Sequence, residues 1–176
     1  MSPDGEFAYA VDPLNNSVVV ARVLTGATLS FAPVEILVDQ QGGNNFLAGA
    51  SALAMTSDGS KIYVVAPGDS RIVEYARNSA TGKLTSTGRS IGTAGLGEIS
   101  DTIVLTNGQL VVLTSGDSIH VFGPDLTLIN SRPIGGGASV AQDTNGNLLV
   151  TSASTGIAGA SDVLRVFNLD LVLLQS

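Results

Sequence analysis

The sequence contains no cysteine and no tryptophan, a single histidine, and only 13% charged residues among its 176 residues. Without cysteine, a disulfide framework, a Cys-ligated zinc site and a thiol nucleophile are all excluded. A formal net charge of −7 argues against nucleic acid or an anionic membrane as partner. No apolar stretch approaches the ~20 residues of a membrane span, and residues 1–6 lack the basic and apolar segments of a signal peptide. The Lys-poor, Ser/Thr/Gly-rich composition nevertheless favours an extracytoplasmic or secreted bacterial protein.

Apolar residues make up 44% of the chain but aromatic residues only 5%, so the core must consist mainly of Val, Ile, Leu and Ala. The 21 glycines lie above the usual share of about 7%. Abundant Gly with Val, Ser and Thr is typical of many short strands joined by tight turns. The length corresponds to one domain on a scale of ~100–200 residues per domain.

A turn signal recurs four times, each time as a small residue or Pro, then Asp or Asn, then Gly. An apolar run follows each of these turns, as in Ile62–Val65. Asp-Gly or Asn-Gly between apolar runs predicts a hairpin with a type I′ turn, in which both central residues have positive φ. The four signals lie at Pro3–Gly5, Ser57–Gly59, Thr106–Gly108 and Thr144–Gly146.

A third apolar run follows each hairpin after a polar loop, and a second shared turn then leads to a fourth run. The third runs are Ser17–Ala21, Arg71–Ala76, Ser118–Phe122 and Val163–Phe167. Four antiparallel strands in roughly 40–50 residues is the size of a β-propeller blade. A β-sandwich is the alternative, but its turns do not repeat in phase. We expect an all-β fold with about four blades in one domain, at residues 1–50, 51–97, 98–137 and 138–176.

The first repeat lacks the beginning of the four-strand pattern. Aligning the turns places Met1 over Met55, which lies at the end of the inner strand of the second repeat. The first blade should therefore lack its inner strand, and the chain is expected to be an open fragment of a propeller with six to eight blades. Open blade edges would leave apolar surface uncovered, so self-association through these edges is also expected.

The first two repeats resemble the blades of lactonase-type propellers. The resemblance rests on the Asp-Gly turn and on a second turn in which Ala76-Arg77, Thr81-Gly82 and Leu84 match Ala21-Arg22, Thr25-Gly26 and Leu29. The run Ile62–Val65 is also similar to the YVTN repeat of surface proteins. The lactonase resemblance implies a seven-bladed propeller in a family that includes 6-phosphogluconolactonases. These motifs specify turns and packing, so they carry over no catalytic residue.

One mouth of a propeller channel is surrounded by the loops between blades and the loops between second and third strands. Carboxylates and amides gathered there could hold a divalent cation or orient a sugar. The alternative is that they are solvated loop residues. The candidate ligand-binding residues are Asn44, Asn45, Asp69, Glu98, Asp101 and Asp117.

Three further motifs are interpreted as structural. Asp143–Asn147 begins like a calcium loop, but Leu148 and Ser154 stand where Gly and Glu are required, so a hairpin turn is expected. Gly92–Gly97 lacks the pattern of a phosphate-binding loop and is expected to connect two blades. His120 lies in a predicted strand of the third blade, away from the mouth, and is expected to have a structural or solvent-facing role.

Two functions follow as alternatives. The first is a non-enzymatic propeller module, a rigid scaffold for a protein or carbohydrate ligand, for which the cell surface is a compatible location. The second is a lactonase-like hydrolase of the 6-phosphogluconolactonase type, in which mouth carboxylates act as a base or through a metal-bound water. No cofactor is required by the sequence, although a calcium ion at the mouth is compatible with it. Whether the protein is an enzyme stays open at this point.

Overall fold

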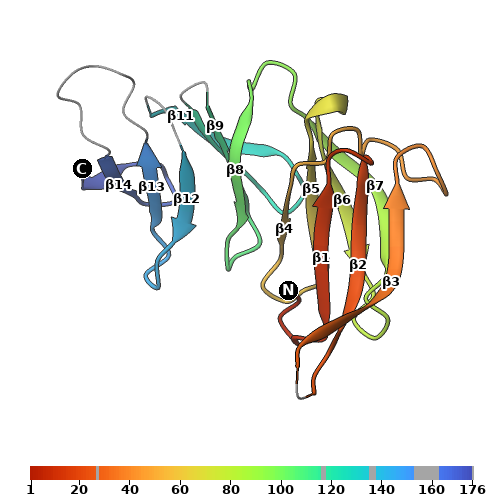
Figure 1. Ribbon diagram of the computed structural model, residues 1–176. Coiled ribbons are helices and arrows are strands. Elements are labelled where there is room, and N and C mark those ends of the chain that lie inside the picture. The colour runs from red at the N-terminus through yellow and green to blue at the C-terminus, as the bar shows by residue number, and fades with distance from the viewer. Residues whose placement is uncertain (27, 116–117, 135–137, 153–162, 176) are drawn as a thin grey trace. The chain divides into compact units, whose positions relative to one another are not determined.

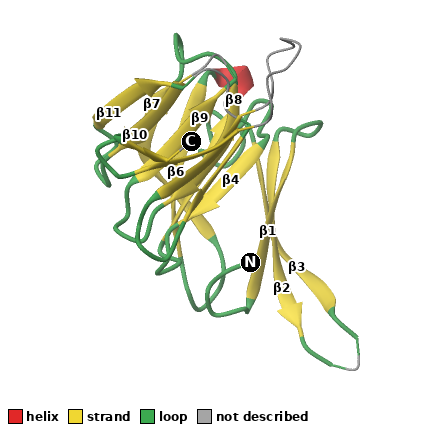
Figure 2. Cartoon of the chain, turned by 90° about the vertical axis from the view of Figure 1, so that its left-hand side faces the viewer, coloured by secondary structure: helices red, strands yellow, loops and turns green. Residues whose placement is uncertain are grey.

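The computed structural model describes residues 1–26, 28–115, 118–134, 138–152 and 163–175. Its regular structure consists of strands and one 3-10 turn, η1 (Pro67–Asp69), within the described residues (Figures 1 and 2). No helix in this part of the chain is long and apolar enough to cross a membrane. The chain divides into two compact units, unit 1 (Met1–Ala94) and unit 2 (Gly95–Ser176).

Unit 1 holds two antiparallel sheets whose strands follow one another in sequence order. The first sheet has three strands, β1 (Phe7–Asp12), β2 (Ser17–Leu24) and β3 (Ser30–Val38). The second has four, β4 (Ala52–Met55), β5 (Lys61–Ala66), β6 (Arg71–Arg77) and β7 (Leu84–Gly92). The predicted absence of an inner strand from the first sheet is confirmed within this unit.

Unit 2 holds two four-stranded antiparallel sheets, again in sequence order. The first contains β8 (Ile99–Val104), β9 (Leu110–Thr114), β10 (Ser118–Phe122) and β11 (Leu128–Pro133). The second contains β12 (Ser139–Gln142), β13 (Leu148–Ser152), β14 (Val163–Phe167) and β15 (Leu173–Gln175). In a Greek-key sandwich the chain would pass between two sheets, whereas here each sheet is completed before the next begins. These are consecutive β-propeller blades, as predicted.

The recurring turns differ from the predicted type in one respect. Only the glycine of each turn has a positive φ, between 69° and 87°, and the preceding Asp or Asn does not, so the type I′ expectation is wrong. Each glycine N–H instead donates to the carbonyl three residues earlier, as Gly59 does to Thr56 at 2.8 Å. The Asp58 carboxylate accepts the Ser60 N–H, which stabilises the turn without a left-handed Asp. The other three turn glycines are Gly5, Gly108 and Gly146.

Each unit has its own apolar core. In unit 1, residues of the two sheets such as Val20, Ile62 and Tyr75 are fully buried against one another. In unit 2, Val111, Ile119 and residues of the following sheet form the second core. Burying one such aliphatic side chain contributes roughly 1.5–3 kcal/mol. Packing of sheet against sheet within each unit therefore holds the connecting loops of that unit in place.

Candidate ligand site

Three connections meet at one end of unit 1, near η1 in Figure 1. They are the β1–β2 connection, η1 itself, and residues 39–50 of the β3–β4 connection, here termed the mouth loop. Backbone N–H groups of the mouth loop donate to side chains at the base of the site. The pairs are Leu47 to Asp39 Oδ1 at 2.9 Å, Ala48 to Asp69 Oδ2 at 2.8 Å, and Gly49 to Asn16 Oδ1 at 2.8 Å. These bonds satisfy a loop that has few apolar side chains to bury.

The backbone at this end of unit 1 is strained. Left-handed φ values occur at Asn16 (49°), Gln40 (57°), Phe46 (72°) and Ser70 (52°). A left-handed conformation is unusual for an aromatic residue such as Phe46. Such conformations cost on the order of 1–3 kcal/mol each, and they cluster at binding and catalytic sites.

A cavity of about 410 Å³, here termed the mouth pocket, lies beside the mouth loop. It is lined by Asp39, Gln40, Asn45, Phe46 and Asp69. Each aspartate uses one carboxylate oxygen to accept a mouth-loop N–H. The second oxygen of each has no hydrogen-bond donor among the described residues, so it is available to a water, a cation or a substrate hydroxyl.

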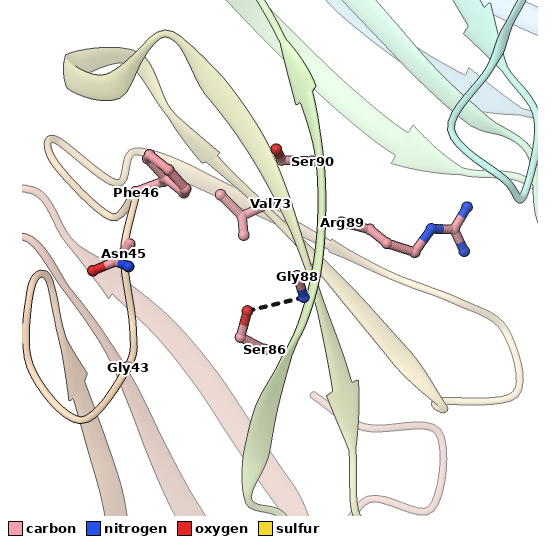
Figure 3. A pocket seen from close by; sticks show the side chains of 8 residues that line it. All are labelled: Gly43, Asn45, Phe46, Val73, Ser86, Gly88, Arg89 and Ser90. Carbon is pink, nitrogen blue, oxygen red and sulfur yellow. Dashed lines mark hydrogen bonds between the residues drawn. The ribbon is translucent and has the colours of Figure 1, made fainter.

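A second cavity of about 150 Å³, here termed the bulge pocket, adjoins the first (Figure 3). Asn45 and Phe46 contribute to both pockets. The remaining lining residues of the bulge pocket are Gly43, Val73, Ser86, Gly88, Arg89 and Ser90. The Asn45-Phe46 dipeptide thus borders both cavities.

The structure brings together two of the six residues predicted from the sequence. Asn45 and Asp69 line the mouth pocket. Asn44 lines a different cavity, of about 350 Å³, with Glu35 and Leu84. Ligand binding by these residues remains a prediction.

The other three predicted residues belong to unit 2. Asp101 lies in β8, and its Oδ2 accepts the Ser139 hydroxyl at 2.8 Å and the Val140 N–H at 2.9 Å. This carboxylate therefore holds β12 to β8, a structural role that the sequence prediction missed. Glu98 accepts the Ser115 N–H through its backbone carbonyl. Asp117 lies outside the described residues.

Asp39 and Phe46 are the site residues that the sequence reasoning missed. Asp39 directly follows the apolar run that forms β3, so a carboxylate at the end of a predicted strand was the available signal. Phe46 is an isolated aromatic residue among Gly and Asn residues, and it is 41% exposed. An exposed aromatic side chain in a polar loop is the feature that could have identified it.

The three motifs interpreted as structural have the expected places. Asp143 accepts the N–H groups of Asn145 and Asn147 within the β12–β13 turn. Residues 93–98, which include all of the Gly92–Gly97 motif except its first residue, connect β7 to β8. His120 lies in β10, and both of its ring nitrogens are buried without a hydrogen-bond partner among the described residues. Burial lowers the pKa of His120 below its usual value. A structural role for His120 remains a prediction.

The described residues contain no group of three or more His, Cys, Asp or Glu side chains placed to hold a metal ion. A cation at the mouth pocket would find two carboxylates, Asp39 and Asp69, and the amide oxygens of Gln40 and Asn45. Calcium takes six to eight oxygen ligands, so water or substrate would have to supply the remainder.

Comparison with known proteins decides the family. The model of the lactonase family, described as a 7-bladed β-propeller, matches residues 1–122. The chain belongs to this lactonase family. The match includes the whole mouth loop and all residues of both pockets. No curated protein sequence matches significantly.

Solved structures share the fold of this lactonase-family chain. A candidate 6-phosphogluconolactonase from Bacteroides uniformis has a TM-score of 0.75 and 17% identity, over 98% of this chain and 51% of its own. A protein from Lactobacillus plantarum has a TM-score of 0.68 and 19% identity, over 96% and 53%. Kuenenia stuttgartiensis hydrazine synthase has a TM-score of 0.72 and 16% identity, over 99% and 46%.

The chain therefore spans about half the length of these relatives. At such low identity the likeness shows the fold alone, and hydrazine synthase illustrates that this fold serves unrelated chemistry. The chemistry of this chain must be argued from its own residues.

Proposed function

We propose that this lactonase-family chain carries part of a sugar-lactone hydrolase, with the mouth pocket as the site that receives the lactone. The observation that carries the proposal is the pair of aspartates, Asp39 and Asp69, whose second carboxylate oxygens are unpaired among the described residues of a strained pocket. The candidate 6-phosphogluconolactonase from Bacteroides uniformis supports lactones of phosphorylated or plain aldonic acids as the first substrates to test.

Hydrolysis of a lactone needs a base but no cofactor. A carboxylate oxygen of Asp39 or Asp69 would take a proton from water as the water oxygen bonds to the lactone carbonyl carbon. The bond between that carbon and the ring oxygen then breaks. The ring oxygen accepts the proton and becomes a hydroxyl, and the product is an open-chain aldonic acid. A positioned base of this kind contributes roughly 10²–10⁴-fold to a rate.

The fixed geometry of the two aspartates supports this role. Each carboxylate is anchored through one oxygen to a backbone N–H of the mouth loop, so its other oxygen has little freedom to turn away. Pre-oriented groups avoid the entropic cost of ordering during the reaction. Gln40 and Asn45 add amide groups that can hydrogen-bond to sugar hydroxyls.

The proposal is tested by following acid release in a pH-stat from gluconolactone and 6-phosphogluconolactone. We expect hydrolysis above the spontaneous rate, and a loss of roughly 10²-fold or more in Asp39→Asn or Asp69→Asn. Asp170→Asn, at an exposed aspartate of unit 2, is the matched control and should keep full activity. Circular dichroism and melting curves show that each variant is folded.

Wild-type protein that hydrolyses neither lactone above background would overturn the proposal and leave the non-enzymatic scaffold as the better interpretation. Equal activity in wild type and both aspartate variants would exclude the mouth pocket as the reacting site. The extracytoplasmic location, the YVTN-type likeness and a calcium ion remain predictions from the sequence.

A further inference from the structure

The bulge pocket owes its form to an irregularity in β7. The pairing of β6 with β7 shifts between Val73, opposite Ser90, and Tyr75, opposite Ser86. The three residues 87–89 thus face a single residue of β6, and Gly88 at their centre has a φ of 75°. Bulges redirect side chains and occur often beside functional sites. Here the bulge opens a space between β7 and the mouth loop (Figure 3).

The pocket lining combines apolar and hydrogen-bonding groups. The Phe46 ring and the Val73 side chain supply apolar surface, while Ser86 and Ser90 supply hydroxyls. Asn45 adds an amide that can both donate and accept. Apolar surface with a few placed hydroxyl and amide groups is suited to a sugar ring, whose C–H groups pack on the former and whose hydroxyls bind the latter.

Arg71 does not itself line this pocket, but its guanidinium contacts two residues that do, Phe46 and Ser90. The Arg71 guanidinium carbon lies 4.4 Å from the centre of the Phe46 ring, and Arg71 Nη1 donates to Ser90 Oγ at 2.6 Å. Arg71 forms no ion pair with any described carboxylate. In contrast, the Arg89 side chain extends away from the pocket in Figure 3, and its Nη1 lies 3.7 Å from Glu74 Oε1.

We propose that the bulge pocket binds a pyranose ring that carries a carboxylate, that is, a hexuronic acid, with the carboxylate on Arg71. A cavity of about 150 Å³ has room for a six-membered ring, since an engineered protein cavity of that size accepts benzene. A guanidinium is suited to a carboxylate because it donates two parallel hydrogen bonds. This site shares Asn45 and Phe46 with the mouth pocket, but its ligand binding does not depend on the hydrolysis proposed there.

A carboxylate fits this pocket better than a phosphate does. Arg71 contacts the lining residues Phe46 and Ser90, whereas the side chain of Arg89, the cation in the lining, extends away from the pocket in Figure 3. Asp39 and Asp69 line the mouth pocket together with the shared residues Asn45 and Phe46, so they oppose a doubly charged group more than a singly charged one. The net charge of −7 likewise disfavours a phosphate more than a carboxylate.

The test is a titration of ¹⁵N-labelled protein with glucuronate and galacturonate, followed by NMR, with glucose, glucose 6-phosphate and acetate as comparison ligands. We expect saturable shifts at the amides of Asn45, Gly88 and Ser90. At least one uronate should bind about tenfold or more tightly than glucose, which is the scale of one charge-assisted pair. Acetate alone should bind more weakly than the uronate because it lacks the ring.

Two variants separate the Arg71 charge from the pocket itself. Arg71→Gln should lower uronate affinity to the level of glucose, and Ser90→Ala should weaken both sugars because it removes a pocket hydroxyl and the anchor of Arg71. The matched control is Arg22→Gln, since Arg22 also stacks on an aromatic ring, Phe7, at 4.6 Å. The control should bind uronate like wild type, and unchanged spectra elsewhere show that the variants fold.

Four results would overturn the proposal: no saturable shift with either uronate, equal affinity for uronate and glucose, tighter binding of glucose 6-phosphate, or shifts confined to Gln40 and Asp69 of the mouth pocket. Binding is measured without turnover, so its failure is distinct from a failure of lactone hydrolysis. Asp69→Asn should lower hydrolysis by roughly 10²-fold or more but keep uronate binding.

Discussion

Arg77 Nη2 lies 2.6 Å from Asp4 Oδ2, which joins β6 of the second sheet to the turn that precedes β1 of the first. Arg77 also donates from Nε to the Tyr9 hydroxyl at 2.7 Å and from Nη1 to the Gly59 carbonyl at 3.3 Å. Hydrogen bonds from Ser2 and Arg77 hold the pKa of Asp4 well below its usual value. The two sheets of unit 1 are therefore fastened at the end opposite the mouth loop by one buried guanidinium.

Replacing Arg77 should destabilise the protein. Arg77→Met removes three hydrogen bonds, including charge-assisted ones, at a residue that is 8% exposed. We expect a loss of about 2–3 kcal/mol in the free energy of unfolding, measured by urea denaturation. Arg22→Met is the control, because its ion pair with Glu6 at 3.4 Å is exposed and should contribute less than about 1 kcal/mol. Equal losses in both variants would contradict the role of Arg77.

Gly82 and Gly5 offer a matched pair for separating backbone strain from crowding. Their φ values are 75° and 73°. A Cβ on Gly82 would meet the Phe7 ring, whereas one on Gly5 would meet nothing within 4 Å. Gly5→Ala should cost about 1–2 kcal/mol through the left-handed backbone alone. Gly82→Ala should lower the free energy of unfolding by roughly 1–3 kcal/mol more than Gly5→Ala does, because Phe7 must move. Thermal denaturation of the two variants measures this difference, and equal Tm values would contradict it.

Tyr75 should make the protein sensitive to alkaline pH. Burial raises its pKa to about 12, with the charge of Asp39 as a second cause. The raised pKa keeps Tyr75 protonated in the native state. Its contribution to the free energy of unfolding is therefore fully present below about pH 10 and is lost as the pH rises toward about 12. Tyr75→Phe should reduce that loss in denaturation curves recorded between pH 9 and 12, roughly the span of the shift.

The same variant tests an unpaired hydroxyl. The Tyr75 hydroxyl is buried and has no hydrogen-bond partner among the described residues. Tyr75→Phe should therefore leave the stability at neutral pH unchanged or raise it by up to about 1 kcal/mol. Tyr63→Phe is the comparison, since the Tyr63 hydroxyl lies 3.3 Å from Glu74 Oε2. Removing that hydroxyl should lower the free energy of unfolding. A clear loss of stability in Tyr75→Phe would show that its hydroxyl is bonded.

His120 should make unit 2 sensitive to acid. Burial lowers its pKa, so the native state binds a proton less readily than the unfolded chain does. This contribution to stability is present above the unfolded pKa of about 6.5 and is lost as the pH falls below it. His120→Phe should lose less stability than wild type between about pH 7 and 5. Parallel curves for the two proteins in that range would contradict the expectation.

Much of the fold could be predicted because it depends on local chemistry. Turn glycines such as Gly59 and Gly108 adopt a positive φ, and short apolar runs bounded by such turns are typical of strands. The repeat of these signals determined the number and order of the sheets, and the family followed from the same motifs. The type I′ turn was predicted wrongly because the Asx side chain competes for backbone N–H groups, an effect that dipeptide statistics do not resolve.

The candidate site depended on tertiary structure. The sequence placed Asn45 and Asp69 at one end of a propeller, but Asp39 joined them only because sheet packing brings the end of β3 beside η1. Asp101, also predicted as a ligand-binding residue, has a contact that the sequence did not indicate, because the start of β12 supplies donors that its carboxylate accepts. Residues far apart in sequence become neighbours through burial of apolar surface between sheets, which depends on the whole core and not on any local pattern. Composition and turn spacing thus determined the fold of this chain, whereas the pockets and their charges were decided by packing.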